Sequence, residues 1–232
     1  MTTTSTARLL TALHRFNAAH PWDHNARYHP WLLRRLPRRF GTALDVGCGS
    51  GELARLLGRR VREVHAVDAD ARIVAMARAA TDGSVPVRYA VADASRELPD
   101  GPYSVITCVA ALHHLPLADT LVRFRQRLAP GGTLVVIGCA RASGFRDHVI
   151  GLSAVPLNAL LGWVKNGFRP APRRPVSLTA RTRDPAETFA EIARTARRLL
   201  PGARLRRRLF WRYTLVWRAP GAPGRAGDPP GA

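Results

Sequence analysis

Residues 44–51 read LDVGCGSG. The stretch begins with the end of an apolar run that is typical of a buried strand, and a helical run follows it at residues 52–57. Between the two stand three alternating glycines, Gly47, Gly49 and Gly51. Glycines allow a tight turn and let a ligand approach main-chain N–H groups at the start of a helix. The stretch therefore predicts a strand–turn–helix unit with a ligand at the turn; a plain tight turn is the alternative.

The chain around this unit alternates apolar runs with helical segments. The runs in its first part are uninterrupted Val, Ile and Leu stretches, typical of parallel strands because both faces of a parallel sheet are covered. Later come an apolar segment at residues 144–166, a helix at residues 185–200 with Asp184 as its N-cap, and strands at residues 203–210 and 212–218. This order predicts an α/β fold with a mostly parallel sheet and helices on both faces. The other predicted strands are residues 42–46, 63–67, 85–91, 103–112 and 133–137, and the other predicted helices are residues 52–57, 69–80 and 117–129.

Two acidic residues stand at the ends of the strands that follow the glycine turn. Asp68 ends the second strand and Asp93 follows the third. The carboxyl ends of parallel strands border the crevice where such sheets bind ligands, and a carboxylate there can bind both ribose hydroxyls of an adenosine. Glu52 stands where a pyrophosphate-binding turn would have its third glycine. The pattern favours an adenosine-containing ligand without a pyrophosphate; a helix-capping role for Asp68 is the alternative.

The composition is globular but strongly basic. Thirty-six Lys and Arg against sixteen Asp and Glu give a net charge of +20, and Lys165 is the only lysine. A nucleic acid or an anionic membrane as partner explains such a charge, and so does an arginine-rich coding bias, which the single lysine favours. The excess lies in the flanks, because residues 41–140 carry +1, residues 1–40 carry +6 and residues 141–232 carry +13. The charge is therefore separate from the motifs above.

The cysteines and the absence of targeting patterns argue against a disulfide-rich, secreted or membrane-spanning protein. Cys48, Cys108 and Cys139 lack the spacing of metal ligands, which predicts neither a disulfide framework nor a metal site and suits the cytoplasm. The first residues do not have the pattern of a secretory signal. The longest apolar stretch, residues 149–164, contains a proline and is shorter than the roughly 20 residues of a membrane span. We expect a cytoplasmic protein.

Together these motifs resemble the class I S-adenosylmethionine-dependent methyltransferases, in the small-molecule branch sometimes called type 11. The resemblance implies a Rossmann-like fold with a mostly parallel seven-stranded sheet, helices on both faces, an N-terminal lid helix and a helical cap insertion. The implied activity is methyl transfer from S-adenosyl-L-methionine to a small molecule. The residues that carry the resemblance are 45–51, Asp68, Asp93, 103–115 and 128–137 (LAPGGTLVVI), and the two closing strands also fit.

The same resemblance implies an organisation of the chain. Residues 1–40 would form a helical lid, and residues 41–218 the methyltransferase domain with a cap insertion at about 141–180. The Pro- and Gly-rich composition of residues 219–232 predicts a disordered tail. The cap has no charged residue between Asp147 and Lys165. That run indicates a hydrophobic acceptor or a membrane-facing surface; an extra core helix is the alternative.

The resemblance also implies how the cofactor is held. In the family, the acid that ends the first strand orients the loop and the cofactor's amino group, and the glycine turn passes its methionine part. The acid after the second strand binds the ribose, and the acid after the third strand reaches the adenine amino group. Ala69 is smaller than the residue that usually flanks the adenine. The implied cofactor-binding residues are Asp45, Gly47, Cys48, Gly49, Gly51, Asp68, Ala69, Asp93, Ala94 and Cys108.

Catalysis of this kind does not require a triad of side chains. Methyl transfer from a sulfonium is an in-line displacement that depends on proximity, and a general base is needed only if the acceptor must lose a proton. His113, after the fourth strand, and His24 are the candidate bases; local packing is the alternative. In a helix over residues 16–36, His24 would share a face with Tyr28, and Asn25 with His29. Candidates for substrate binding are Tyr28, His29 and His114.

Two other functions remain open. The first is an RNA methyltransferase that uses its basic flanks, although residues 204–212 (RLRRRLFWR) equally suit an edge hairpin and no RNA-binding module is recognisable. The second is a catalytically inactive, methyltransferase-like binding protein, against which the intact glycine turn and the two acids count. We expect a small-molecule substrate, a nucleic acid being disfavoured. Peripheral membrane contact stays open, as does the choice between a monomer and a dimer.

Overall fold

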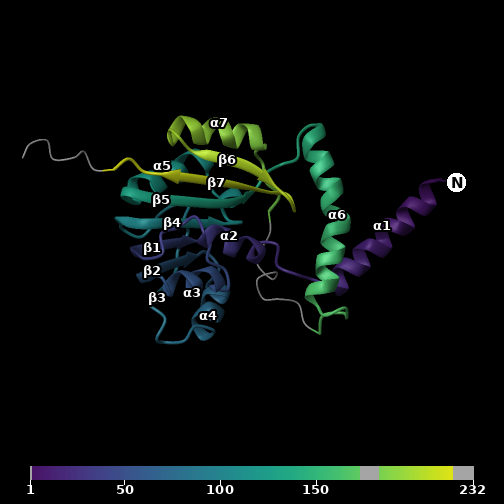
Figure 1. Ribbon diagram of the computed structural model, residues 1–232, viewed down its shortest axis with the longest axis horizontal. Coiled ribbons are helices and arrows are strands. Elements are labelled where there is room, and N and C mark those ends of the chain that lie inside the picture. Colours follow the sequence, from purple (N-terminus) through teal and green to yellow (C-terminus); the bar gives the residue numbers. More distant parts are fainter. Residues whose placement is uncertain (1, 173–182, 222–232) are drawn as a thin grey trace, which may run out of the picture.

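The computed structural model describes residues 2–172 and 183–221. These residues form a seven-stranded sheet in the order β3-β2-β1-β4-β5-β7-β6, with helices on both faces (Figure 1). The first five strands are parallel, and β7 pairs antiparallel with both β5 and β6. The predicted fold class is confirmed. The strands are β1 (Phe40–Val46), β2 (Val61–Asp68), β3 (Val87–Val91), β4 (Tyr103–Val109), β5 (Leu128–Cys139), β6 (Arg204–Arg208) and β7 (Arg212–Arg218).

Two hydrophobic layers enclose the sheet. In β5, Leu134 and Val136 pack toward the layer that contains α5 and α7, whereas Val135 and Ile137 pack toward the layer that contains α2, α3 and α4. All four side chains are fully buried. Because neighbouring residues of a strand point to opposite faces, only a continuous apolar run can supply both layers. The helices are α1 (Thr2–Ala19), α2 (His29–Leu33), α3 (Glu52–Gly58), α4 (Ala71–Ala79), α5 (Leu117–Arg127), α6 (Phe145–Lys165) and α7 (Phe189–Leu199), with 3-10 turns η1 (Ala26–Tyr28) and η2 (Leu112–His114).

The order of the strands reverses direction between β1 and β4. These two strands are neighbours, with Asp45 beside Thr107 in register, and the chain leaves them toward opposite edges of the sheet. A crevice opens at such a switch point, outside the carboxyl ends of the strands. The fold thereby brings the glycine turn, the end of β2 and the end of β4 to one place.

Several element boundaries differ from the predicted ones. The strand expected to reach residue 112 ends at Val109, because Ala110 has a positive φ of 53° and the chain turns into η2. The helix expected from residue 185, with Asp184 as its N-cap, begins instead at Phe189. Thr188 and Glu191 form a capping box there, a signal that the sequence contained. The helix expected from residue 69 begins at Ala71, with Asp70 as its N-cap.

The N-terminal region is not the single helix assumed for residues 16–36. Helix α1 ends at Ala19, close to Pro21, because a proline disfavours helical geometry in the residue before it. Residues 20–25 are not helical, so His24 does not share a helix face with Tyr28, nor Asn25 with His29. Figure 1 shows α1 running away from the sheet beyond α6.

The apolar segment after β5 forms one long helix, α6, which contains Pro156. It packs through Ala154 against Trp22 and Phe210, and it stands to one side of the sheet, past the turn between β6 and β7 (Figure 1). None of the helices in the described ranges is long and apolar enough to cross a membrane. Part of the predicted cap, residues 173–182, and the predicted tail from residue 222 onward lie outside the described residues.

Candidate functional site

A cavity of about 570 Å³ opens at the switch point. Its size is within the range of small-molecule and cofactor sites. The predicted residues that line it are Asp45, Gly47, Cys48, Gly49, Asp68, Ala69, Asp93, Ala94, His29 and His114. It is lined as well by Asp23, Asn25, Val46, Ser50, Glu52, Leu53, Val67, Asp70, Ala71, Ile73, Ala92, Val109, Ala110, Ala111 and Leu115.

The glycine turn forms the floor of this cavity. Gly47 has a φ of +71°, and a Cβ on it would lie 2.2 Å from the Cβ of Ala111, so no larger residue fits. Gly49 has a φ of +52°, but no atom lies within 4 Å of the position that its Cβ would take. Gly49 therefore leaves open space on the cavity side, where a ligand can lie against the backbone.

Asp68, at the end of β2, holds the turn in place. Its Oδ2 accepts a hydrogen bond of 2.9 Å from the backbone N–H of Gly49, and its Oδ1 accepts one of 3.0 Å from that of Asp70. An ionised carboxylate has about four acceptor positions, so each oxygen keeps capacity for a further donor. The geometry leaves Asp68 able to accept hydrogen bonds from two adjacent hydroxyls in the cavity.

Asp45 is a buried acid with one unsatisfied oxygen. Its Oδ1 accepts a hydrogen bond of 2.7 Å from the hydroxyl of Thr107, whereas its Oδ2 is buried without a partner. Burial, opposed by the hydrogen bond from Thr107 and reinforced by the nearby carboxylate of Asp68, raises the pKa of Asp45 to about 7. A buried polar atom without a partner calls for a ligand, and a cationic donor suits this one best.

Asp93 stands at the rim of the cavity, after β3. Its Oδ1 accepts a hydrogen bond of 2.9 Å from the backbone N–H of Ser95, and hydrogen bonds from Ser95 lower the pKa of the carboxyl group. Asp93 is therefore ionised at neutral pH. Together with Asp45, Asp68 and the open space at Gly49, it forms a set of acceptors that fits an aminoacyl nucleoside: an ammonium, two hydroxyls and an exocyclic amine.

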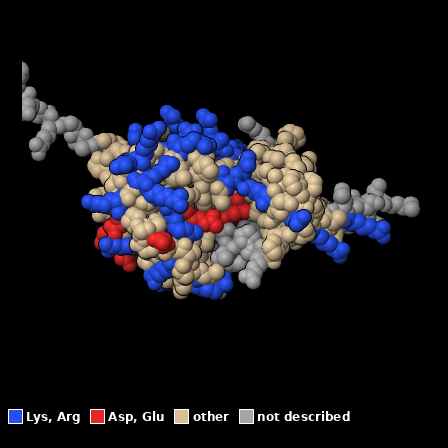
Figure 2. Space-filling view, turned by 60° about the horizontal axis from the view of Figure 1, so that its bottom comes forward, with Lys and Arg blue, Asp and Glu red and all other residues tan. Residues whose placement is uncertain are grey.

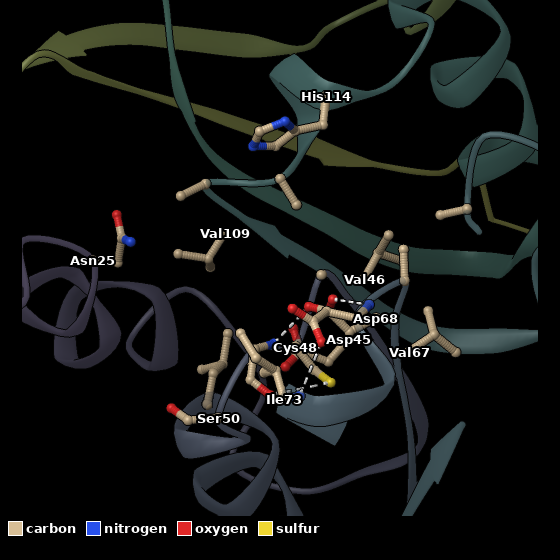
Figure 3. Close-up of a pocket in the computed structure, with 18 of the residues that line it drawn as sticks. Asn25, Asp45, Val46, Cys48, Ser50, Val67, Asp68, Ile73, Val109 and His114 are labelled. Carbon is tan, nitrogen blue, oxygen red and sulfur yellow. Dashed lines mark hydrogen bonds between the residues drawn. The ribbon is translucent and has the colours of Figure 1, made fainter. Parts of the chain in front are cut away.

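The far side of the cavity is mostly apolar. Val109, Ala110 and Ala111, at the end of β4, and Leu115 after η2 line this side. His114 and Asn25 supply polar groups there, and Figure 3 shows both set apart from the carboxylates of Asp45 and Asp68 across the open space. This side can hold an apolar molecule with a few polar atoms.

The two histidines of η2 are placed differently. His114 lines the cavity, and burial lowers its pKa. His113 does not line it: its Nδ1 is buried without a partner, burial lowers its pKa to about 4, and its ring lies 4.1 Å from that of His114. Of this pair, only His114 has direct access to a molecule in the cavity.

Four other predicted residues lie outside the cavity lining. The Nε2 of His24 hydrogen-bonds Asn158 Oδ1 at 2.5 Å, and Tyr28 donates a bond of 2.8 Å to the carbonyl of Leu209. Cys108 is fully buried in the sheet. Gly51 is the N-cap of α3, and a Cβ on it would lie only 2.3 Å from the hydroxyl of Tyr89. These four residues support elements around the cavity.

Several cavity residues were not among the predicted site residues. Asn25, expected to share a helix face with His29, lines the cavity from a non-helical segment, where its Oδ1 accepts a hydrogen bond of 3.1 Å from Arg212 Nε. Thr107, the hydroxyl partner of Asp45 on β4, positions that carboxylate but does not itself line the cavity. Residues 109–111 line the cavity at the end of β4. The sequence could have predicted this position, because the carboxyl ends of the strands beside the switch point border the crevice.

The cavity is acidic although the chain is strongly basic. Its described lining includes no lysine or arginine. Figure 2 shows acidic side chains gathered in a hollow between the body of the sheet and α6, amid a surface that is mostly blue and tan. Such a lining attracts cations and repels phosphate groups. The carboxylates in it are those of Asp23, Asp45, Glu52, Asp68, Asp70 and Asp93.

Comparisons with known proteins agree on one family. The model of a methyltransferase domain matches residues 44–136. The chain is 34% identical over 202 residues to an uncharacterized methyltransferase of Mycobacterium tuberculosis, covering 86% of this chain and 98% of that protein. A ubiquinone biosynthesis O-methyltransferase of Sodalis glossinidius is 34% identical over 130 residues, which are 50% of this chain and 52% of that protein.

Solved structures share the fold at low identity. A putative S-adenosylmethionine-dependent methyltransferase from Listeria monocytogenes superposes with a TM-score of 0.60 at 14% identity, covering 85% of this chain and 99% of that chain. The PH0226 protein from Pyrococcus horikoshii gives a TM-score of 0.58 at 19% identity, with 88% and 95% covered.

Proposed function

This chain belongs to the class I S-adenosylmethionine-dependent methyltransferases, and we propose that its cavity binds S-adenosyl-L-methionine beside a small hydrophobic acceptor. The observation that carries the proposal is the unsatisfied Oδ2 of Asp45 in an acid-lined cavity. An acceptor atom in this position calls for a cationic ligand such as the cofactor's ammonium group. The acceptors around it suit the other polar groups of the same cofactor.

Each polar residue of the cofactor side of the cavity has a proposed role. Asp45 accepts hydrogen bonds from the ammonium group, and Asp68 accepts them from the two ribose hydroxyls. Asp93 accepts a hydrogen bond from the adenine amino group, while the backbone at Gly49 lies against the ligand. The bound cofactor supplies an electrophilic methyl group on a sulfonium. The protein holds the acceptor in line with that group, and alignment of this kind can contribute about 7–11 kcal/mol.

His114 is the proposed general base for a hydroxyl acceptor. It lines the cavity beyond the glycine turn, and burial lowers its pKa, so its imidazole is neutral at neutral pH. A neutral imidazole can take the hydroxyl proton as the oxygen attacks the methyl group. In this proposal His114 replaces His113 as the candidate base, because the ring of His113 lies outside the cavity lining.

The lining favours a small hydrophobic acceptor over RNA. Its far side is built from Val109, Ala110, Ala111 and Leu115, and its polar groups are mostly carboxylates. A nucleic acid would bring phosphates toward these carboxylates, and like charges repel. The similarity to a ubiquinone biosynthesis O-methyltransferase fits an apolar acceptor that is methylated on oxygen.

The proposal is tested in two steps. Isothermal titration calorimetry with S-adenosyl-L-methionine and with S-adenosylhomocysteine measures whether the cavity binds the cofactor. Transfer of a radiolabelled methyl group to hydroxylated apolar compounds, and in parallel to RNA, then identifies the acceptor class. We expect binding of both cofactor forms and label in the apolar compounds. No binding would refute the cofactor assignment, and label confined to RNA would refute the acceptor assignment.

A further inference from the structure

Helix α6 carries an apolar stripe on its outer face. Phe145 is 82% exposed and Leu152 is 75% exposed, and the exposed side chains recur every three or four residues along the helix. This spacing places them on one face, like the buried stripe of an ordinary surface helix, but here the stripe faces outward. The apolar stripe consists of Phe145, Val149, Leu152, Pro156, Leu160 and Trp163.

The opposite face of α6 anchors the helix to the protein. Ala154 is fully buried against Trp22 and Phe210. Gly162 lies so close to the N-terminal segment that a Cβ on it would be 2.5 Å from the carbonyl oxygen of His20. Because this face is packed, α6 cannot turn to bury the stripe without breaking these contacts.

An aromatic side chain extends the stripe at its C-terminal end. The ring of Phe168, just beyond the helix, lies 4.8 Å from that of Trp163, and Phe168 is exposed. Trp211, in the turn between β6 and β7, is also exposed, but it lies against the side of α6 that carries Ala154, with its indole nitrogen 3.2 Å from the position that a Cβ on Gly151 would take. The stripe itself thus ends in two exposed aromatic rings, those of Trp163 and Phe168.

The charges around the stripe are positive. Asp147 is the only acid in α6, and it is neutralised by Arg207, whose Nε lies 2.6 Å from its Oδ1. Arg141, Lys165 and Arg169 are exposed near the two ends of the helix. Figure 2 shows the surface in the region of α6 as largely tan, with blue at its borders. An apolar strip bordered by cations complements an anionic surface.

We propose that the apolar stripe of α6 docks the enzyme on a bilayer that contains anionic lipids. Phe, Leu and Trp on one face with Arg and Lys at the edges is the composition of helices that lie in a membrane interface. A second copy of the chain fits the stripe less well. Such a dimer would bring the cations of Arg141, Lys165 and Arg169 on two chains of net charge +20 close together.

The inference extends the proposed function, because an apolar acceptor dissolves in a bilayer and docking would bring the enzyme to it. Docking does not depend on that function, since the vesicle experiment requires neither cofactor nor turnover. A failure to bind vesicles would therefore leave the cofactor and acceptor assignments untouched. Conversely, vesicle binding by a protein that does not bind the cofactor would leave the docking surface standing.

Co-sedimentation with vesicles tests the proposal on the full chain. Vesicles of phosphatidylcholine with phosphatidylglycerol are compared with vesicles of phosphatidylcholine alone, at low and high salt. Leu152→Glu places a charge in the stripe, and Met76→Glu is the matched control, because Met76 is an exposed apolar residue of α4. Thermal melting of all three proteins verifies that they are folded.

We expect the wild type and Met76→Glu to sediment with the anionic vesicles, and less so at high salt. Leu152→Glu should weaken this binding by about tenfold, because a carboxylate is costly in the interface. Absence of wild-type binding would overturn the proposal, and so would equal binding by Leu152→Glu. Sedimentation velocity tests the alternative of a dimer. If the wild type does not bind vesicles but forms a dimer that Leu152→Glu dissociates, the stripe binds a second copy of the chain and the membrane proposal is overturned.

Discussion

Thr107 Oγ1 donates a hydrogen bond of 2.7 Å to Asp45 Oδ1 across the switch point of the sheet. The two residues are neighbours in register on β1 and β4, and both are almost completely buried. The bond fixes the carboxylate at the cavity wall and leaves its Oδ2 without a partner. Binding of a cation at this oxygen should therefore depend on the ionisation of Asp45.

The affinity for S-adenosyl-L-methionine should rise between pH 6 and pH 8. Burial raises the pKa of Asp45 to about 7, so the carboxyl group is mostly protonated below this pH and cannot pair with an ammonium group. Calorimetry at several pH values measures the change. In Asp45→Asn the affinity should be lower and should lose the step near pH 7. A step of equal size in this variant would assign the pH dependence to another group.

Asp45 should also lower the stability of the protein as the pH rises. Its folded pKa of about 7 exceeds the ordinary value of 3.8, so the folded state holds a proton that the unfolded state releases between these values. The free energy of unfolding therefore decreases over this interval because of Asp45. Urea denaturation of the wild type and Asp45→Asn at pH 4, 5.5 and 7 measures it. The stability of Asp45→Asn relative to the wild type should increase with pH; a constant difference would contradict the raised pKa.

Asp68→Ala should weaken cofactor binding by at least about tenfold. The change removes the proposed acceptor for the ribose hydroxyls, and it frees the backbone N–H groups of Gly49 and Asp70 from their partner. Loss of a hydrogen bond costs about 0.5–1.5 kcal/mol, so the fold should survive. Calorimetry and circular dichroism measure the two effects. Asp100→Ala, at an exposed carboxylate outside the cavity lining, is the control, and unchanged affinity in Asp68→Ala would refute the ribose assignment.

The two glycines of the turn should respond differently to substitution by alanine. Gly47→Ala forces a Cβ to within 2.2 Å of the Ala111 Cβ at a positive φ, so it should lower the free energy of unfolding by about 1–3 kcal/mol or more. Gly49→Ala meets no atom and should cost only about 1 kcal/mol for its backbone strain. Its methyl group projects into the open space, so cofactor affinity should fall. Denaturation and calorimetry distinguish the two; equal stability of both variants would contradict the described packing.

His114→Gln should lower kcat for a hydroxyl acceptor by about 10²-fold or more, because it removes the proposed general base. The KM for S-adenosyl-L-methionine should change little. In the wild type, kcat should rise with pH as His114 loses its proton, with a midpoint below the ordinary histidine pKa of 6.5. In His114→Gln this rise of kcat should be absent. His113→Gln is the matched control and should lose no more than a few-fold, since His113 lies outside the cavity lining. A larger loss in His113→Gln than in His114→Gln would reverse the assignment.

The fold could be predicted from local patterns in the sequence. The run at residues 44–51 could be recognised locally, because an apolar run, a glycine turn and a helical run follow one another directly in the chain, although Asp68 also holds the turn in place. The uninterrupted apolar runs indicated parallel strands, since only a sheet covered on both faces buries such a run. Asp68 and Asp93 could be placed at the crevice from the sequence because each follows a predicted strand. The capping box of Thr188 and Glu191 is an equally local pattern that marks the start of α7.

The sequence by itself thus determined the α/β fold and the position of the glycine turn and the acids along the strands. Only the tertiary structure decided which side chains share the cavity. His114 faces it and His113 does not because Ala110 turns the chain out of β4 with a positive φ. Asn25 reaches it through a hydrogen bond from Arg212, and Thr107 meets Asp45 across two strands. These are contacts between residues far apart in the chain, and no local pattern encodes them.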